Sequence, residues 1–261
     1  MDYTYWYLFP IGIIIATLAM SAGISGANFW IPVYLILIKL DPLICFWLAL
    51  ITMIFGFGSG VIRNVYQGSV NWYIVRQYLI ITVPAAMLGS LLTSYIDGNF
   101  LILIFGSFIF IYGTYMLKSC FTSQKAPEKH QKIFWGIGFM AGFLKGLIAT
   151  GLGKLIVPGM WDHEKIDHPS QVIGSAVVII FIVNIVAAVT RMNPVFVSGL
   201  VENGSELWNI LVFVIPSVVI GGQIGPQVIR DVDAEGLKKY IAVMLIFVSL
   251  LIFSRGLIPA W

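Results

Sequence analysis

Two lysines in an apolar stretch are the residues of this sequence with the clearest capacity for chemistry. Lys145 and Lys154 lie in KGLIATGLGKLIVPG (residues 145–159), where no carboxylate accompanies them. An unpaired ammonium group at the centre of a bilayer costs at least about 2.5–3.5 kcal/mol, so each lysine needs a negative partner or a route to water. A small anion would be that partner for Lys154, and Lys145 could add a second positive charge. The alternative is that either side chain extends to the membrane surface as an anchor.

Glycine-rich interruptions occur in the lysine segment and at one other place in the chain. The first is GISGAN (23–28) and the second is ATGLGK (149–154). Non-helical backbone in hydrocarbon persists only beside protein or a watery cavity, and paired interruptions are typical of the substrate site of secondary transporters. The half-helix after each break points free N–H groups and its positive dipole end at the gap, which favours an anion. We therefore expect substrate-binding residues from both breaks: Ser25, Gly26, Asn28, Thr150, Gly151, Gly153, Lys154 and Lys145.

The composition places these breaks inside a membrane protein. Hydrophobic residues make up 59% of the 261 residues and charged residues 10%, whereas a soluble domain carries about 25% charged residues. We expect an all-α, multi-pass protein of the cell membrane, surrounded by the lipid bilayer, with no cofactor and no nucleic-acid partner. Since a span needs about 20 apolar residues, the expected apolar segments are 5–22, 28–40, 43–62, 72–95, 99–118, 132–149, 152–160, 170–190, 206–229 and 237–256.

The order of the motifs indicates two homologous halves. GISGANFWIP aligns with ATGLGKLIVP, which places Asn28 opposite Lys154. Three further pairs follow in the same order: DPLICFWLA with HPSQVIGSA, QGSVNW with NGSELW, and VPAAMLGS with IPSVVIGG. We therefore expect a first transmembrane repeat over residues 1–118, a cytoplasmic linker over 119–131, and a second transmembrane repeat over 132–261, each repeat with a broken or re-entrant helix.

The basic residues that flank the segments favour an inverted topology for the two halves. If each interrupted segment crosses the membrane once, the chain has eight spans and these residues divide eight to five between the two sides. If each is a re-entrant hairpin, ten fall on one side, and Lys39, Arg191 and Arg255 fall on the other. The second division agrees better with the excess of lysine and arginine in cytoplasmic loops. It places the linker in the cytoplasm, both termini outside, and Lys165 on the same side as Arg76.

Three further polar residues lie in or beside the spans. Arg63 and Arg191 close the second long segment of each half, and interfacial anchoring is the role that we expect for both. Asn184 lies within FIVNIVAAV, where it could belong to the site or donate a hydrogen bond to a neighbouring helix.

The duplicated pattern resembles the sulfite exporter TauE/SafE family of membrane transporters. The likeness rests on a glycine-rich break, an apolar run and a proline, followed by a helix, an R…G…W stretch and a proline-glycine helix, and it covers nearly the whole chain. The resemblance implies export of a small sulfur-containing or organic anion, of the sulfite, sulfonate or sulfoacetate type, driven by an ion gradient. It also implies that the family's glycine run corresponds here to Gly23, Ser25, Gly26, Ala27 and Asn28 in the first half, and to Gly151, Gly153 and Lys154 in the second.

This chain departs from the family's G-x-G-G-G run in both halves. Ala27 and Asn28 replace glycines in the first copy, and Lys154 does so in the second. A charged replacement in a substrate-facing run suggests altered selectivity or a doubly charged ligand. We expect alternating access around an anion bound near the membrane midplane. A coupling proton or other ion, and a homodimer, are compatible with the sequence but not specified by it.

Two alternative functions stay open. A passive small-anion channel fits because no carboxylate inside the spans provides a proton relay. An intramembrane metalloenzyme is suggested by WDHEKIDHP, which contains His163, Glu164, Asp167 and His168. The two histidines are one residue too far apart for the zinc-binding H-E-x-x-H pattern on one helix face. We therefore expect a transporter and not an enzyme, with no catalytic residue and no metal site.

Overall fold

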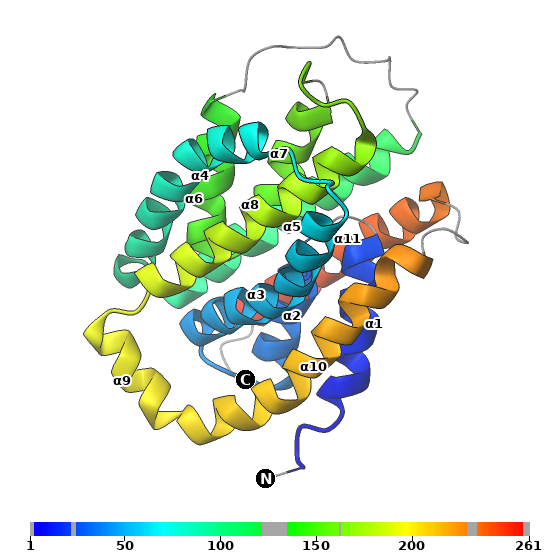
Figure 1. Ribbon diagram of the computed structural model, residues 1–261. Helices are drawn as coiled ribbons and strands as arrows, with labels where there is room; N and C mark the ends of the chain where they lie inside the picture. Colours follow the sequence, from blue (N-terminus) through cyan, green and yellow to red (C-terminus); the bar gives the residue numbers. More distant parts are fainter. Residues whose placement is uncertain (1–2, 22–24, 122–134, 162, 229–233, 258–261) are drawn as a thin grey trace.

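The computed structural model describes residues 3–21, 25–121, 135–161, 163–228 and 234–257. The fold of these residues is all-helical (Figure 1). Gly23 and most of the expected linker over 119–131 lie outside the described residues. The α-helices are α1 (Leu8–Ser21), α2 (Ala27–Pro32), α3 (Pro42–Tyr66), α4 (Trp72–Leu92), α5 (Gly98–Ser119), α6 (Trp135–Ile148), α7 (Leu152–Trp161), α8 (Pro169–Thr190), α9 (Pro194–Glu202), α10 (Gly204–Val228) and α11 (Ala234–Leu257).

Within the residues that the structure describes, five helical stretches are long and apolar enough to cross a bilayer, so the protein is a multi-pass membrane protein. They are Pro42–Tyr66, Trp72–Tyr95, Gly98–Ser119, Ser170–Thr190 and Gly204–Ile224. The second of these continues α4 through a short 3₁₀ turn. Helices α1 and α6, with 14 residues each, are too short to cross, because a span needs about 20 residues. Each of them directly precedes one of the expected breaks.

Local capping explains where the spanning helices begin. Asp41 accepts a hydrogen bond from the Leu43 backbone N–H, just before Pro42 at the first helical position of α3. Asn71 and Asp97 cap α4 and α5 in the same way through their side-chain oxygens. Such oxygens satisfy N–H groups that have no partner inside the helix, and proline suits the first turn because it needs no such partner.

Two pairs of parallel helices pack through glycines. Helix α1 packs along α10, and α6 packs along α4. A Cβ atom added to Gly221 of α10 would meet the Ile13 backbone of α1. One added to Gly89 of α4 would likewise meet the Phe143 backbone of α6. Because glycine has no side chain, the helix backbones approach closely at these positions.

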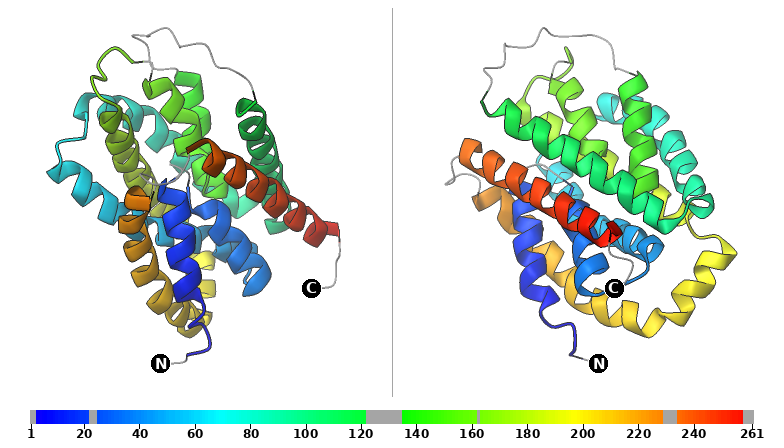
Figure 2. Two further views of the ribbon diagram at one scale, coloured as in Figure 1. Left: turned by 90° about the vertical axis from the view of Figure 1, so that its right-hand side faces the viewer. Right: turned by 180° about the vertical axis from the view of Figure 1, so that it is seen from behind.

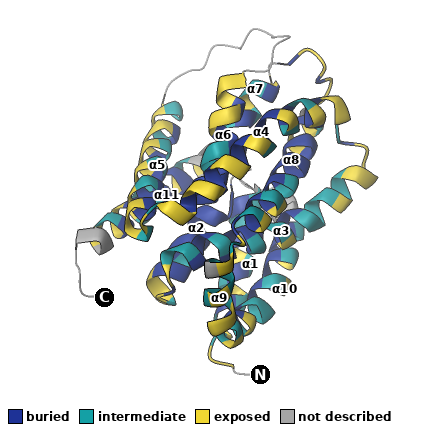
Figure 3. Cartoon of the chain, turned by 90° about the vertical axis from the view of Figure 1, so that its left-hand side faces the viewer, coloured by how far each residue is buried: buried dark blue, intermediate teal, exposed yellow. Residues whose placement is uncertain are grey.

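Two pairs of antiparallel helices complete the bundle (Figure 2). In the pair α3–α8, the Trp47 side chain donates a hydrogen bond to the Ala188 carbonyl, whereas Gly60, further along α3, lies near Val177. In the pair α5–α11, Gly106 lies beside Ile252 and the later Gly113 lies beside Leu245. Helices α3 and α8 are the most enclosed of these five helices: 56% and 67%, respectively, of the residues in their apolar 18-residue stretches are buried (Figure 3).

The structure differs from the sequence-based segments in two places. The stretch between the expected segments 170–190 and 206–229 forms a separate helix, α9, because Asn193 caps it and Pro194 starts it. The short segment after the first break is α2 followed by a π-helical turn, Val33–Leu37. Pro32 stands at the junction, and its missing N–H and ring disfavour a regular α-helical turn there.

Candidate functional site

The two breaks meet inside the protein. Asn28 lies in the first turn of α2, and Thr150 lies between α6 and α7. The Thr150 hydroxyl donates a hydrogen bond to Asn28 Oδ1 at 2.5 Å. Both side chains are fully buried. The expected residues Asn28 and Thr150, which are 122 residues apart in the chain, therefore form a direct contact between the two halves.

Lys154 lies in the first turn of α7, and its ammonium group is held among aromatic rings of α5. Nζ lies 4.0 Å from the centroid of the Tyr112 ring and 5.5 Å from that of Phe108. The residue is only 8% exposed, and Nζ has no hydrogen-bond partner within the described part of the chain. The rings attract the charge through their electron-rich faces but offer no acceptor oxygen. The alternative role of Lys154 as a surface anchor is therefore wrong.

Lys145 and Arg191 both bind the main chain at the end of α6. Lys145 Nζ donates to the Ala149 carbonyl at 2.7 Å. Arg191 Nη2 donates to the carbonyls of Gly146 at 2.6 Å and Leu147 at 2.9 Å. The last carbonyls of a helix have no partner within it and carry the negative end of its dipole. These two cations supply the missing donors.

Burial corrects the expected role of Arg191. Interfacial anchoring is wrong for this residue, since Arg191 is 3% exposed and its guanidinium reaches into the bundle. Arg63, at the equivalent place in the first half, is half-buried. Lys145 is 1% exposed, so it too does not extend to the surface. No local pattern around Arg191 signals this role, because its partners lie 44 and 45 residues earlier.

Unusual backbone conformations shape the second break. Ala149 has φ 57° and Gly151 has φ 97°. Left-handed backbone is open to glycine but costs other residues roughly 1–2 kcal/mol. The hydrogen bond from Lys145 fixes the carbonyl of the strained Ala149.

The other expected glycines let neighbouring helices approach the breaks. A Cβ on Gly26 would lie 3.0 Å from Met53 Cε of α3, and one on Gly153 would lie 3.0 Å from Ile180 Cδ1 of α8. In each half the glycine and its neighbour are separated by the same number of residues along the chain. The two breaks are therefore packed against equivalent positions of the central helices.

The sequence left the role of Asn184 of α8 undecided. It is fully buried, and neither its Oδ1 nor its Nδ2 finds a hydrogen-bond partner among the residues that the structure describes. Its neighbours on the same helix face, four residues before and seven after, are Ile180 and Arg191. These contact Gly153 and the end of α6, respectively. Asn184 therefore faces the second break, and the hydrogen bond to another helix is not formed.

Several buried donors around the breaks lack an acceptor in the described regions. They are Ser25 Oγ, Asn28 Nδ2, Lys154 Nζ, Asn184 Nδ2 and Arg191 Nε. Most buried polar groups in proteins are hydrogen-bonded, and an unsatisfied one costs about 1–3 kcal/mol. The buried polar residues of the described regions include no Asp or Glu. The cluster is thus cationic and rich in free donors, which is the chemistry of an anion site.

The polar loop that suggested a metalloenzyme has its own internal partners. His163 Nδ1 accepts a hydrogen bond from the Lys165 backbone N–H. Burial, together with the nearby Lys165 charge, lowers the pKa of His163. Among the described residues, no group of three or more His, Cys, Asp or Glu could hold a metal ion.

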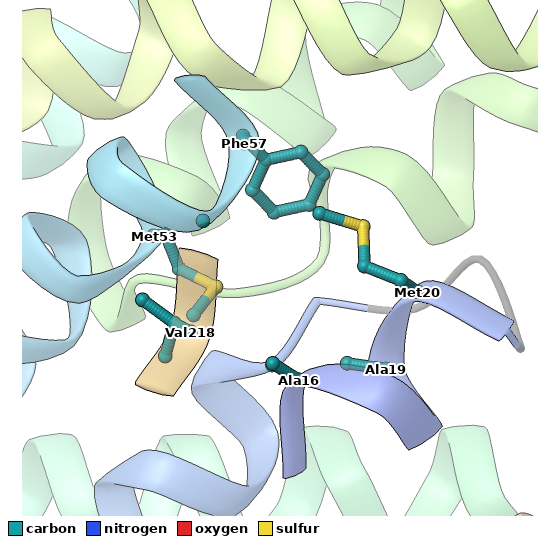
Figure 4. A pocket seen from close by; sticks show the side chains of 8 residues that line it. Ala16, Ala19, Met20, Met53, Phe57 and Val218 are labelled. Carbon is teal, nitrogen blue, oxygen red and sulfur yellow. The ribbon is translucent and has the colours of Figure 1, made fainter. Parts of the chain in front are cut away.

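An apolar pocket, partly open to its surroundings, lies at the first break (Figure 4). The pocket and its opening together contain about 270 Å³ of empty space. Its lining residues come from α1, α3 and α10 together with the break itself: Ala16, Ala19, Met20, Gly26, Met53, Gly56, Phe57 and Val218. Of the expected site residues, it includes Gly26 only.

Comparison with known proteins agrees with this architecture. The family model described as "Sulfite exporter TauE/SafE" matches residues 8–252. The chain is similar to the "Probable membrane transporter protein YunE" of Bacillus subtilis (strain 168), with 21% identity over 96% of this chain and 97% of that protein. It is also similar to a "Probable membrane transporter protein" of Xylella fastidiosa (strain Temecula1 / ATCC 700964), with 23% identity over 76% of this chain and 75% of the relative. No solved structure matches the chain.

Proposed function

This chain belongs to the sulfite exporter TauE/SafE family, a family of transporters and not of enzymes, and we propose that it exports a small sulfur-containing or organic anion held between its two breaks. The anion would be of the sulfite, sulfonate or sulfoacetate type. Asn28, Ser25 and the Gly26 backbone would contact it from the first half. From the second half, the contacts would come from Lys154, Thr150 and the backbone of Gly151 and Gly153.

One observation carries this proposal. The breaks are joined by the Thr150–Asn28 hydrogen bond, and beside that contact Lys154 is buried with no acceptor for Nζ among the described residues. An anion would give the ammonium group, Asn28 Nδ2 and Asn184 Nδ2 the acceptors that these donors lack. Lys145, in contrast, is committed to the Ala149 carbonyl, so we assign it to holding the break and contributing charge, without direct contact to the substrate.

The packing of the helices supports inverted halves. Helices α3 and α8 carry matching sequence motifs, and α5 and α11 each end a half. Both pairs run antiparallel. Furthermore, α1 packs on α10 as α6 packs on α4, so each half contributes its first helix to the other. A two-fold axis in the membrane plane produces this exchange, and inverted-repeat transporters have this symmetry.

Contacts between loops support the same topology. Asn71, before α4, donates a hydrogen bond to the Lys165 carbonyl, and Asn193, after α8, donates one to Ser94 after α4. Since α4 and α8 each run from the first contact toward the second, these contacts lie at opposite ends of the bundle. Lys165 therefore lies on the side of the α3–α4 connection, as the re-entrant hairpin requires. In alternating access, one half would move as a body relative to the other. Pro84 in α4 and Pro216 in α10 are the positions at which these helices would bend.

Replacing Lys154 tests the proposal. Because a hydrogen bond to a charged group contributes about 1.5–3 kcal/mol, Lys154→Gln should weaken binding of methanesulfonate or sulfite roughly ten- to hundredfold. Isothermal titration calorimetry on the purified full-length protein measures this, with sulfate and acetate as further probes. The matched control is Lys165→Gln, because Lys165 also lies over an aromatic ring, 3.5 Å from the Tyr73 centroid, but in the loop. Unchanged anion affinity in Lys154→Gln would reassign Lys154 to packing against Tyr112.

A further inference from the structure

Two aromatic side chains of α5 contact both the second break and the ammonium group of Lys154. Phe108 and Tyr112 are four residues apart on this helix, so they lie on one face of it. Their rings are nearly parallel, at 13°, with centroids 6.5 Å apart. A Cβ atom added to Gly151 would lie 3.1 Å from Phe108 Cζ, so the ring packs on the break where glycine leaves room. Lys154 Nζ lies 4.0 Å from the Tyr112 centroid.

We propose that Phe108 and Tyr112, the aromatic pair, are positioning residues of the anion site: their ring faces hold the Lys154 ammonium group beside the break, where it meets the anion. The inference rests on the proposed function and gives α5 of the first half a role in it. The aromatic pair acts through Lys154, because the electron-rich face of a ring attracts a cation and not an anion.

The surroundings of Lys154 explain why its ammonium group needs such a support. Lysine carries its charge at the end of a flexible four-carbon stem. Lys154 is only 8% exposed, and Nζ has no hydrogen-bond acceptor within the described part of the chain. Without the rings, the ammonium group would lie beside the break in only a fraction of the molecules. The measured affinity for an anion falls in proportion to such a fraction.

A ring face holds a cation without using the hydrogen bonds that an anion needs. An ammonium group has three N–H bonds, and the Tyr112 ring covers one side of it. Lys145, by contrast, is held by a hydrogen bond to the Ala149 carbonyl at 2.7 Å. Contact with the ring and a hydrogen bond to an anion can therefore exist together at Lys154, so the aromatic pair strengthens anion binding and does not compete with it.

Substitutions of Tyr112 in the purified full-length protein test this role. Tyr112→Leu keeps an apolar side chain but removes the ring face. It should weaken binding of methanesulfonate about two- to thirtyfold in isothermal titration calorimetry, the range of a cation–π contact. Tyr112→Phe loses only the hydroxyl and should retain wild-type affinity. The matched control is Tyr73→Leu, which removes the ring beneath Lys165, 3.5 Å from Nζ, and should leave the affinity unchanged.

A double-mutant cycle with Lys154→Gln distinguishes positioning from a general defect in packing. If Tyr112 acts through Lys154, adding Tyr112→Leu to Lys154→Gln should cause no further loss of methanesulfonate affinity, because the interaction is already absent. An equal loss in both backgrounds would assign Tyr112 to packing. Failure of Tyr112→Phe to retain affinity would overturn the inference, and so would wild-type affinity in Tyr112→Leu.

These outcomes can be told apart from a failure of the anion site itself. If Lys154→Gln binds methanesulfonate as tightly as the wild-type protein, both the proposed function and this inference fail. If Lys154→Gln weakens binding and Tyr112→Leu does not, only the role of the aromatic pair fails. If Tyr112→Leu does not purify as folded protein, Phe108→Leu removes the ring 5.5 Å from Nζ. It should give a smaller loss that is likewise absent in Lys154→Gln.

Discussion

Arg191 shows how one buried side chain can stabilise the end of a short helix inside the bundle. Its guanidinium binds two of the last carbonyls of α6, and Lys145 binds the carbonyl of Ala149, which directly follows the helix. Exposed carbonyls at this point would carry the negative end of the α6 dipole toward the proposed anion site. The two cations thus stabilise the end of α6 and remove an electrostatic obstacle to an anion beside Lys154.

Removing the arginine should destabilise the protein. Arg191→Gln cannot donate to both carbonyls with a charged group, so we expect a loss of about 1.5–3 kcal/mol in unfolding free energy. Thermal unfolding of the purified protein in detergent measures this as a lower midpoint. Arg63→Gln is the control, because Arg63 is half-buried in the last turn of α3. Equal midpoints for the two variants would show that the Arg191 hydrogen bonds contribute no net stability.

The sequence identifies some residues of the site better than others. Lys154 and Asn28 stand out because a charge or an amide is unexpected in an apolar, glycine-interrupted segment. In the sequence, Arg191 at the end of an apolar segment looks the same as an interfacial anchor. Asn184 within an apolar segment looks the same as a residue that forms a hydrogen bond to a neighbouring helix. Their roles depend on which part of α6 and α7 lies opposite α8, and this is set by packing between distant segments and not by local spacing.

At the scale of the helices, close contact between α4 and α6 positions the second break. Gly138, Gly142 and Gly146 recur every four residues and therefore form one face of α6. Cβ atoms on Gly142 and Gly146 would meet the backbone of Thr82 and Ala86, respectively. The end of α6, and with it Lys145 and Ala149, is thereby fixed against a membrane-spanning helix. The spacing of these glycines is visible in the sequence, but their partner helix is not.

A methyl group in this seam should separate the two helices. Gly146→Ala would place Cβ against the Ala86 carbonyl, and overpacking of this kind typically costs about 1–3 kcal/mol. Since the break follows directly, anion affinity should fall together with the unfolding midpoint. Gly136→Ala is the matched control, because a Cβ at Gly136 of the same helix meets nothing within 4 Å. If Gly146→Ala retains wild-type stability and affinity, the seam does not position the break.

At the scale of the whole molecule, the two proposed topologies differ in where one loop lies. Figure 1 shows the α7–α8 connection at the end of the molecule opposite to α9. The structure joins that connection to the start of α4 through Asn71 and Lys165. The distribution of basic residues favours the same arrangement, but it depends on only a few residues. Contacts between the halves are stronger support, because they give the relative directions of the helices. The sequence repeats show only which helices correspond.

Cysteine labelling from each side of the membrane tests this arrangement. In a protein without Cys45 and Cys120, single cysteines replace Tyr66, Lys165 or Tyr95, which are exposed in the structure. An impermeant maleimide should modify Tyr66→Cys and Lys165→Cys from the same side and Tyr95→Cys from the other. Right-side-out and inverted vesicles provide the two directions of access. The eight-span model predicts instead that Lys165→Cys is labelled from the side opposite to Tyr66→Cys.

The exchange of first helices has a consequence for biosynthesis. Tyr5, just before α1, forms its hydrogen bond with Glu206, which is 201 residues later in the chain. A ribosome that has delivered α1 to the bilayer must therefore synthesise most of the protein before α10, the neighbour of α1, exists. During that interval the side of α1 that packs on α10 has to be covered by lipid or by the insertion machinery, and assembly of the first half is completed only when the second half arrives.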